Sequence, residues 1–192
     1  FDCRNITFNK NVLLQHFIGL TIETNENKFD PSTVILMDFR CNQSRGLHFI
    51  YVIPFSKKKA LIESTLFSKN IEDRKFYLSA INSYLKENFN TNFFKVLKEE
   101  KGIIPMQYMN FSLENSVSIG TRGGATKPSS GYTFIYIQKQ ISNIIYQLNN
   151  NLKINNIIHT KFSLFMDKIF IKALEKNPKF FPDLFYKMNS RL

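Results

Sequence analysis

Four stretches rich in apolar, often β-branched or aromatic, side chains dominate the first part of the chain. The first stretch partly alternates between apolar and polar positions, and short polar turns separate the four, which is typical of strands. The predicted strands are Val12–Thr24, Thr33–Arg40, Gly46–Phe55 and Ala60–Phe67. Because the links between them are short, we predict that they form an antiparallel meander.

The apolar spacing becomes helical farther along the chain. Side chains three and four positions apart predict amphipathic helices at Glu72–Phe89, Tyr132–Leu148 and Thr160–Glu175, and Pro178 and Pro182 are expected to end the last one. Between the first two helices we predict a strand at Phe93–Leu97, a short extended piece at Gly102–Met106 and a β-prone run at Asn115–Ile119. Strands followed by helices indicate either one α+β unit or a sheet domain attached to part of a larger α/β protein.

Each of the last two predicted helices carries an apolar face. The first face consists of Phe134, Ile137, Ile141, Ile144, Ile145 and Leu148, and the second of Phe162, Phe165, Met166, Ile169, Phe170, Ala173 and Leu174. Two interpretations of the second face stay open, because an amphipathic period does not distinguish them: packing on the domain core, which is the commoner case, and contact with a membrane surface.

Composition and charge narrow the function classes. The chain has 192 residues and a net charge of +11, and its lysines are dispersed apart from Lys57–Lys59, so we expect a solvated basic surface and no nucleic-acid partner. No apolar run approaches the roughly 20 residues that a membrane-spanning helix needs. Cys3 and Cys41 suggest a reducing compartment, and neither they nor the three histidines have metal-ligand spacing, so we predict no metal site.

A glycine-rich loop, residues 118–132, lies between the β-prone run and the second helix and reads SIGTRGGATKPSSGY. Glycines permit positive φ angles and close approach of a ligand, and the free amides at a helix start favour an anion. Ser129 or Ser130 is the expected helix cap, and Arg122 and Lys127 are cations that either meet phosphate or are solvated. A bound phosphate or cofactor and a loop without ligand both remain open.

Two carboxylates interrupt apolar strands and are the candidate catalytic groups. Asp38 follows a run of apolar residues, and Glu63 lies within the strand Ala60–Phe67. A carboxyl on a buried face is costly to ionise, so its pKa rises and it suits a general acid. The alternatives are a solvated strand face for Glu63 and a pair with Arg40, two residues away, for Asp38.

An ordered set of short segments carries a resemblance to a known family. The segments are residues 1–4, 15–19, 35–40, 49–56, 60–65, 102–106, 119–132 and 165–170. Each is weak alone, but their order over nearly the whole chain is specific. The set resembles the flavin-dependent lycopene cyclases of carotenoid biosynthesis, particularly the bacterial β-cyclases.

The resemblance implies a fold like that of the flavoprotein hydroxylases, with a dinucleotide-binding domain and a sheet domain over the flavin. It implies a mainly sheet substrate domain at residues 1–106 with one helix at 72–89, the flavin-contacting loop and helix at 107–150, and a C-terminal helical segment at 151–192. It further implies an isomerase that closes the ends of lycopene into β-ionone rings, at the cytoplasmic face of a bacterial membrane. Reduced FAD is the implied cofactor and NAD(P)H the reductant.

The resemblance also implies roles for particular residues. Glu63 matches the family's catalytic glutamate. The implied FAD neighbours are Gly120, Gly123, Gly124, Pro128 and Gly131.

The sequence departs from the family pattern at three places. Ser64 stands where many relatives have a second acid, Arg122 stands where they have a small residue, and the G-x-G-x-x-G dinucleotide fingerprint is missing. We therefore expect the C-terminal portion of a cyclase, which alone neither holds FAD tightly nor is active. The alternatives are a flavin-dependent monooxygenase or halogenase, and a basic module that binds a membrane or nucleic acid and leaves Glu63 unexplained.

Overall fold

The structure is a computed structural model that describes residues 1–4, 11–111 and 116–189 and divides the chain into two compact units. We call them the loop unit, Phe1–Leu13 with Pro105–Lys176, and the sheet unit, Leu14–Ile104 with Asn177–Leu192. Compared with the domain ranges predicted from the sequence, residues 1–13 group with the glycine-rich loop, and residues 151–192 are divided between the units.

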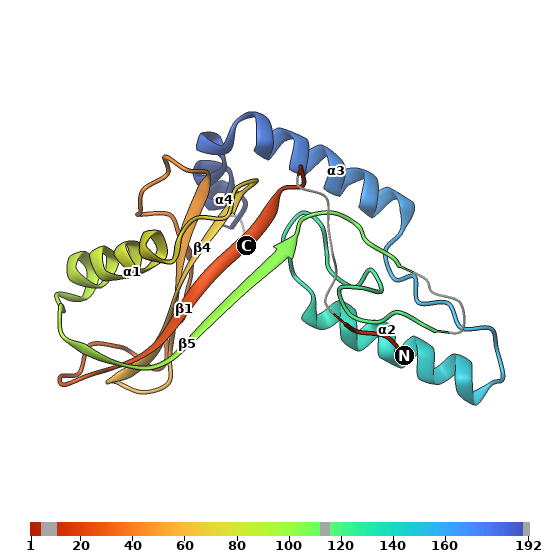
Figure 1. Cartoon of the computed structure of the whole chain (residues 1–192), viewed down its shortest axis with the longest axis horizontal. Helices are drawn as coiled ribbons and strands as arrows, with labels where there is room; N and C mark the ends of the chain where they lie inside the picture. The colour runs from red at the N-terminus through yellow and green to blue at the C-terminus, as the bar shows by residue number, and fades with distance from the viewer. Residues whose placement is uncertain (5–10, 112–115, 190–192) are drawn as a thin grey trace. The chain divides into compact units, whose positions relative to one another are not determined.

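The sheet unit is built on a five-stranded sheet with the order β2-β3-β4-β1-β5 (Figure 1). Its strands are β1 (Leu14–Thr24), β2 (Ile35–Asp38), β3 (Leu47–Pro54), β4 (Lys59–Ser68) and β5 (Phe94–Pro105). β3 pairs antiparallel with β2 and β4, as the meander prediction requires. The prediction was wrong for β1, which pairs with β4 instead of β2. Most of β1 is buried on both faces, which suits a central position in the sheet.

β5 is one continuous strand where the sequence predicted two separate pieces. The charged run Lys98–Lys101 interrupts the apolar pattern, but the strand continues through it. β5 is an edge strand and most of its side chains are exposed, so charges are tolerated and protect the edge from pairing with other chains.

Helix α1 (Arg74–Phe89) covers one face of the sheet (Figure 1). Asp73 caps its start by accepting a hydrogen bond from the Phe76 amide at 2.9 Å, and Asn90 ends it in the left-handed conformation. The core between helix and sheet is formed by alternate strand residues and one helix face: Ile18, Leu20, Ile22, Ile50, Val52, Ile62, Tyr77, Ile81, Tyr84 and Leu85. Side chains that alternate with these strand residues face away from α1.

A further short helix completes the sheet unit. Pro178 ends helix α3, as predicted, and begins a 3₁₀ turn, Pro178–Phe180, but Pro182 lies within the first turn of helix α4 (Phe181–Asn189). Pro182 was predicted to end a helix and α4 was not predicted, although proline fits the first turn of a helix without losing a hydrogen bond. The Phe185 ring of α4 stacks on Phe39 at a centroid distance of 5.8 Å.

The loop unit contains the glycine-rich loop and helices α2 (Phe134–Asn149) and α3 (Lys161–Lys176). Asp2 forms a parallel bridge with Ser118, so the chain's first residues lie beside the loop's entry. Of the predicted β-prone run, Asn115 lies outside the described residues. Among the described residues, no helix is both long and apolar enough to cross a bilayer.

Helix α2 differs from its prediction in two respects. It begins at Phe134 after Thr133, so the serine caps predicted at Ser129 and Ser130 were wrong. Its buried residues are Gln140 and Ile144, whereas most of the predicted apolar face is exposed: Phe134, Ile141, Ile145 and Leu148. The apolar period was correct, but the side that packs on the loop carries a glutamine.

Candidate active-site residues

Glu63 lies at the centre of the sheet, on the face away from α1. Its register partners are Tyr51 on β3 and Gly19 on β1, and its side chain is half-buried. The Thr65 hydroxyl donates a 2.7 Å hydrogen bond to Glu63 Oε1, which favours the ionised carboxyl. Burial is the larger effect and raises the pKa of Glu63, and the charge of Glu100 raises it further. Glu63 therefore holds a proton more readily than a solvated glutamate.

A second carboxylate comes close to Glu63 because residue 19 is a glycine. A Cβ atom at residue 19 would lie 3.1 Å from Glu100 Cγ, so the β5 side chain of Glu100 reaches over the space that a larger residue would fill. Across β4, burial and the charge of Glu63 raise the pKa of Tyr51 to about 12, so its hydroxyl keeps its proton. Glu63 is thus bordered by a neutral phenol and an acid.

Ser64 points to the opposite face of the sheet. Its hydroxyl oxygen lies 2.8 Å from His48 Nε2 in a buried hydrogen bond on the α1 side. Because neighbouring strand residues face opposite sides, a side chain at position 64 does not share a pocket with Glu63. The departure at Ser64 therefore leaves the surroundings of Glu63 unaltered.

Asp38 forms the pair with Arg40 that the sequence suggested, and it lies on the α1 side. Arg40 donates to both carboxylate oxygens, with an Nη2–Oδ2 distance of 2.6 Å, and the Tyr84 hydroxyl donates to Oδ2 at 2.6 Å. Burial alone would raise the pKa of Asp38, but the hydrogen bonds from Arg40 and Tyr84 outweigh it and lower the pKa. Asp38 is held ionised, so the structure places the two candidate carboxylates on opposite faces with opposite proton affinities.

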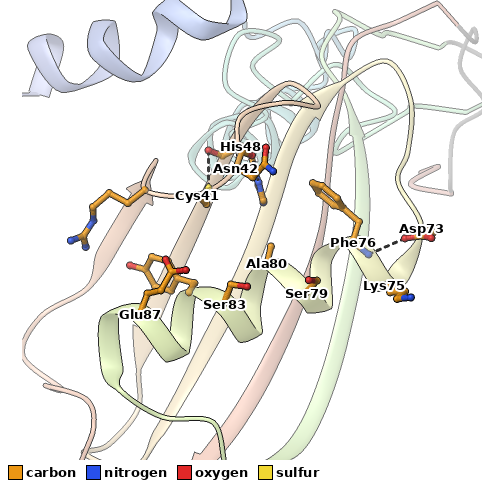
Figure 2. A pocket seen from close by; sticks show the side chains of 12 residues that line it. Cys41, Asn42, His48, Asp73, Lys75, Phe76, Ser79, Ala80, Ser83 and Glu87 are labelled. Atoms are coloured by element: carbon orange, nitrogen blue, oxygen red, sulfur yellow. Dashed lines mark hydrogen bonds between the residues drawn. The ribbon is translucent and has the colours of Figure 1, made fainter.

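A cavity of about 510 Å³ lies next to Asp38, between α1 and the segment that joins β2 to β3. Figure 2 shows Ser79, Ser83 and Glu87 along α1, with Cys41, Asn42 and His48 across from them. Burial raises the pKa of the Cys41 thiol to about 12, which keeps it protonated and unreactive. The cavity therefore offers no nucleophilic thiolate at Cys41, and Glu63 does not line it.

The glycine-rich loop is a closed turn whose shape depends on its glycines. Gly120, Gly124 and Gly131 have φ angles of 65°, 78° and 68°, and a Cβ atom at Gly123 would lie 2.2 Å from the Ser118 carbonyl oxygen. Of the five predicted FAD neighbours, Gly120 is half-buried and Gly123, Gly124, Pro128 and Gly131 are buried. The amides of the four glycines all donate within the chain, so the loop offers a ligand its surface and not those amides.

Gln140 of α2 is hydrogen-bonded through its side chain to the backbone of this turn. Its side chain is fully buried, accepts a hydrogen bond from the Gly120 amide at 2.8 Å and donates to the carbonyls of Gly123 at 2.8 Å and Asn156 at 3.0 Å. Gln140 was not predicted from the sequence as a functional residue. The available signal was a glutamine within an apolar helical period, four residues before Ile144.

The two cations of the loop are held by carboxylates. Arg122 Nε lies 2.9 Å from Asp2 Oδ2, and Lys127 Nζ lies 2.7 Å from Asp167 Oδ1, with both carboxylates buried. The predicted alternatives were a phosphate contact and a solvated pair, and the structure shows ion pairs instead. The Arg122 side chain, the second departure from the family pattern, is thus directed at Asp2.

The described residues contain no group of three or more His, Cys, Asp and Glu side chains placed to hold a metal ion. His16 and His48 are buried and hydrogen-bonded within the sheet unit. Burial lowers the pKa of both, that of His16 to about 4, so both are neutral at pH 7.

Comparison with known proteins decides the family. A family model described as lycopene cyclase protein matches residues 4–192. The chain belongs to the lycopene cyclase family. It is 29% identical over 143 residues to the lycopene beta-cyclase of Paracoccus sp. (strain N81106 / MBIC 01143), a match that covers 70% of this chain and 36% of the relative. This lycopene cyclase chain thus spans about a third of the length of that relative.

One solved structure with a TM-score above 0.5 has a fold similar to that of this lycopene cyclase chain. It is a geranylgeranyl bacteriochlorophyll reductase-like protein from Thermoplasma acidophilum. The match covers 97% of this chain and 41% of that protein's chain, with a TM-score of 0.54 and 11% identity. A flavoprotein/dehydrogenase from Cytophaga hutchinsonii also matches. That match covers 74% of this chain and 36% of the other protein's chain, with a TM-score of 0.44 and 13% identity.

Proposed function

We propose that this chain provides the proton donor and the flavin-side loop of a lycopene β-cyclase, an isomerase that closes the linear ends of lycopene into β-ionone rings without net redox change. Membership of the lycopene cyclase family and the identity to a β-cyclase support the substrate class. The observation that carries the proposal is Glu63, half-buried on the face away from α1 with its pKa raised by burial.

The proposed step begins with the neutral carboxyl of Glu63. Its proton passes to the terminal carbon–carbon double bond, the neighbouring olefin attacks the resulting tertiary cation, and loss of a different proton leaves the ring double bond. Glu63 regains a proton from solvent, so atoms and electrons balance without an oxidant. Protonating an alkene requires a carboxyl that still holds its proton near neutral pH, and burial, which raises the pKa of Glu63, favours that protonated form.

Tyr51 and Phe17 fit the apolar surroundings that the step requires. Tyr51 stands across from Glu63, and Phe17 crosses Gly102 so closely that a Cβ atom there would lie 2.4 Å from the phenyl ring. Aromatic faces exclude water and stabilise nearby cations. These side chains are the proposed lining for the end of an apolar polyene.

FAD is the proposed cofactor, in its reduced form with NAD(P)H as reductant. The residues present fit such a group, because the loop has three glycines with positive φ and the N-cap Thr133 makes no side-chain hydrogen bond to the first turn of α2. Gly120, Gly123, Gly124, Pro128 and Gly131 are the proposed neighbours. When bound, a reduced flavin would supply negative charge that stabilises a cation. The residues of the loop would form part of the surface that contacts it.

Asp38 has a different part in this proposal. Its pKa is lowered and it lies on the face that α1 covers, so we assign it to fastening α1 to the edge of the sheet through Tyr84 and not to proton donation.

The proposed location is the cytoplasmic surface of a bacterial membrane, because the substrate dissolves in lipid.

The test uses a protein of the relatives' full length that contains this chain, expressed in lycopene-accumulating cells. We expect β-carotene or γ-carotene from the unaltered protein and unchanged lycopene from Glu63→Gln. Glu100→Gln is the matched control, since it also neutralises an acid on this face, and it should retain ring formation. Ring formation by Glu63→Gln at the unaltered level would refute the proposed acid. Oxygen consumption in step with product would indicate a monooxygenase instead.

A further inference from the structure

Helix α3 presents an exposed apolar stripe. Phe162, Phe165, Met166 and Ile169 are 72%, 58%, 47% and 47% exposed, and their spacing of three and four residues places them along one side of the helix. The opposite side faces the loop unit through buried Asp167 and Leu174. Core packing therefore explains only part of the predicted apolar face, and the larger side chains point outward.

Exposed lysines follow one flank of this stripe. Lys161, Lys168 and Lys172 are seven and four residues apart, which places them on the same side of the helix, next to the stripe and away from Asp167. Large apolar side chains beside a row of lysines are the arrangement of helices that lie in the plane of a membrane surface. Their apolar side enters the boundary between headgroups and acyl chains, and the ammonium groups meet anionic headgroups.

Helix α2 offers an internal contrast. It also exposes a stripe, Phe134, Ile141, Ile145 and Leu148, but its sequence contains one lysine, Lys139, and no acid. The α2 stripe has no row of cations beside it to pair with anionic lipid, whereas the α3 stripe has a row of lysines. Charge complementarity therefore distinguishes the two exposed faces and selects α3 for a lipid surface.

An apolar groove connects the lysine flank of α3 with the glycine-rich loop. It has a volume of about 430 Å³ and is lined by Leu164, Lys168 and Ile171 of α3, by Met106 and by Pro128 of the loop. Lys168 and Pro128 both line it. A helix lying on lipid with Lys168 at the headgroups would thus hold the groove close to the membrane surface.

We propose that α3 is the membrane-docking element of this protein: it lies on an anionic lipid surface with Phe162, Phe165, Met166 and Ile169 inserted and Lys161, Lys168 and Lys172 at the headgroups, and the adjoining groove admits an apolar chain from the lipid. The docking contact stands on α3 alone. Only the groove's cargo, a polyene, rests on the proposed function.

The test is flotation of the full-length protein with vesicles of phosphatidylcholine, with and without phosphatidylglycerol. The unaltered protein should float with the anionic vesicles, and added salt should weaken the binding. The double variant Phe162→Ser, Phe165→Ser should lose binding at least tenfold. The triple variant Lys161→Glu, Lys168→Glu, Lys172→Glu should lose the preference for phosphatidylglycerol. The matched control Ile141→Ser, Ile145→Ser on α2 should float like the unaltered protein, and thermal melts should show that all variants are folded.

Three outcomes would overturn the proposal. The α3 stripe variant floats as well as the unaltered protein, or the α2 control loses binding to the same extent, or the stripe variant only converts a dimer in solution into a monomer, which would make the face a contact between two copies. Because flotation needs no cyclisation, protein that floats without forming rings would count against the proposed function alone. Protein that forms rings without floating would count against α3 docking alone.

Discussion

Tyr51 on β3 lies directly opposite Glu63 on β4, on the face of the sheet that α1 does not cover. The pairing places a phenol beside the candidate acid, and the charge of Glu63 contributes to raising the pKa of Tyr51 to about 12. A neutral phenol cannot compensate the charge of an ionised Glu63. The arrangement therefore favours the protonated carboxyl that alkene protonation requires.

The raised pKa of Glu63 predicts the pH dependence of the reaction. Ring formation should fall as pH rises through this pKa, because the carboxyl loses the proton that it donates. Glu100→Gln removes a charge that raises the pKa of Glu63, so the falling limb should move to lower pH. The measurement is kcat/KM against pH for both proteins. A limb that stays in place would show that Glu63 does not set it.

The same pKa predicts how Glu63 affects stability. A carboxyl whose pKa is raised in the folded protein binds its proton more tightly there than in the unfolded chain, so its contribution to stability is lost as pH rises through the raised pKa. The free energy of unfolding of Glu63→Gln, relative to that of the unaltered protein, should therefore increase as pH rises, because only the unaltered protein has a carboxyl at this position to ionise. Urea unfolding at pH 5 and pH 8 measures the difference. A gain that is equal at both pH values contradicts the shift.

Asp38→Asn and Tyr84→Phe separate fastening from catalysis. Tyr84→Phe removes the 2.6 Å hydrogen bond to Asp38 and should lower the free energy of unfolding by about 1 kcal/mol. Asp38→Asn removes the charge that Arg40 pairs with and should cost about 1–3 kcal/mol. Both variants should still cyclise lycopene when folded, as pigment extracts would show. Folded Asp38→Asn protein without ring formation would restore Asp38 as a catalytic candidate.

Gln140 should control flavin binding without touching the flavin. Gln140→Ala leaves the Gly120 amide and the Gly123 and Asn156 carbonyls without their buried partner and should cost about 2–4 kcal/mol of stability. We expect FAD affinity to fall at least tenfold in the full-length protein, measured by flavin fluorescence. Asn143→Ala, on the exposed side of the same helix, is the control. Unchanged FAD affinity in folded Gln140→Ala protein would exclude this role.

Buried histidines predict acid sensitivity. Burial lowers the pKa of His16 from 6.5 to about 4, so the unfolded chain binds a proton that the folded protein does not between these values. This part of the stability is fully present above pH 6.5 and is lost as pH falls toward 4, and His48 acts in the same direction. His16→Gln should flatten the curve of unfolding free energy against pH in this range. An equally steep curve would contradict the assignment.

The sequence predicted the elements that have a clear apolar period and missed the details that depend on neighbours. The strands β1 to β4 and the helix α1 were found close to their observed bounds, and the Asp38–Arg40 pair followed from a spacing of two residues. The position of β1 beside β4 was not predictable from short links, since pairing depends on burial of both strand faces. The continuity of β5 was hidden because charges on an edge strand break the apolar pattern without breaking the strand.

The candidate site was predictable only in part, because its contacts join residues that are far apart in the sequence. The interruption of an apolar strand by Glu63 pointed to a raised pKa, but its neighbours Tyr51, Gly19 and Glu100 come from three other strands and depend on register. The glycines of the loop were visible in the sequence, whereas the pairing of Lys127 with Asp167 joins residues 40 positions apart. Contacts of this kind depend on how α3 packs on the glycine-rich loop, which the local sequence around either residue does not reveal.

The most direct test of Glu63 as the proton donor is cyclisation by the purified full-length protein, with reduced FAD, in deuterated water. The carboxyl exchanges its proton with solvent, so mass spectrometry should show one deuterium incorporated for each ring that the unaltered protein forms, and Glu63→Gln should form no rings. Rings from Glu63→Gln at the unaltered rate, or rings without deuterium, would contradict a mechanism that begins with the proton of Glu63.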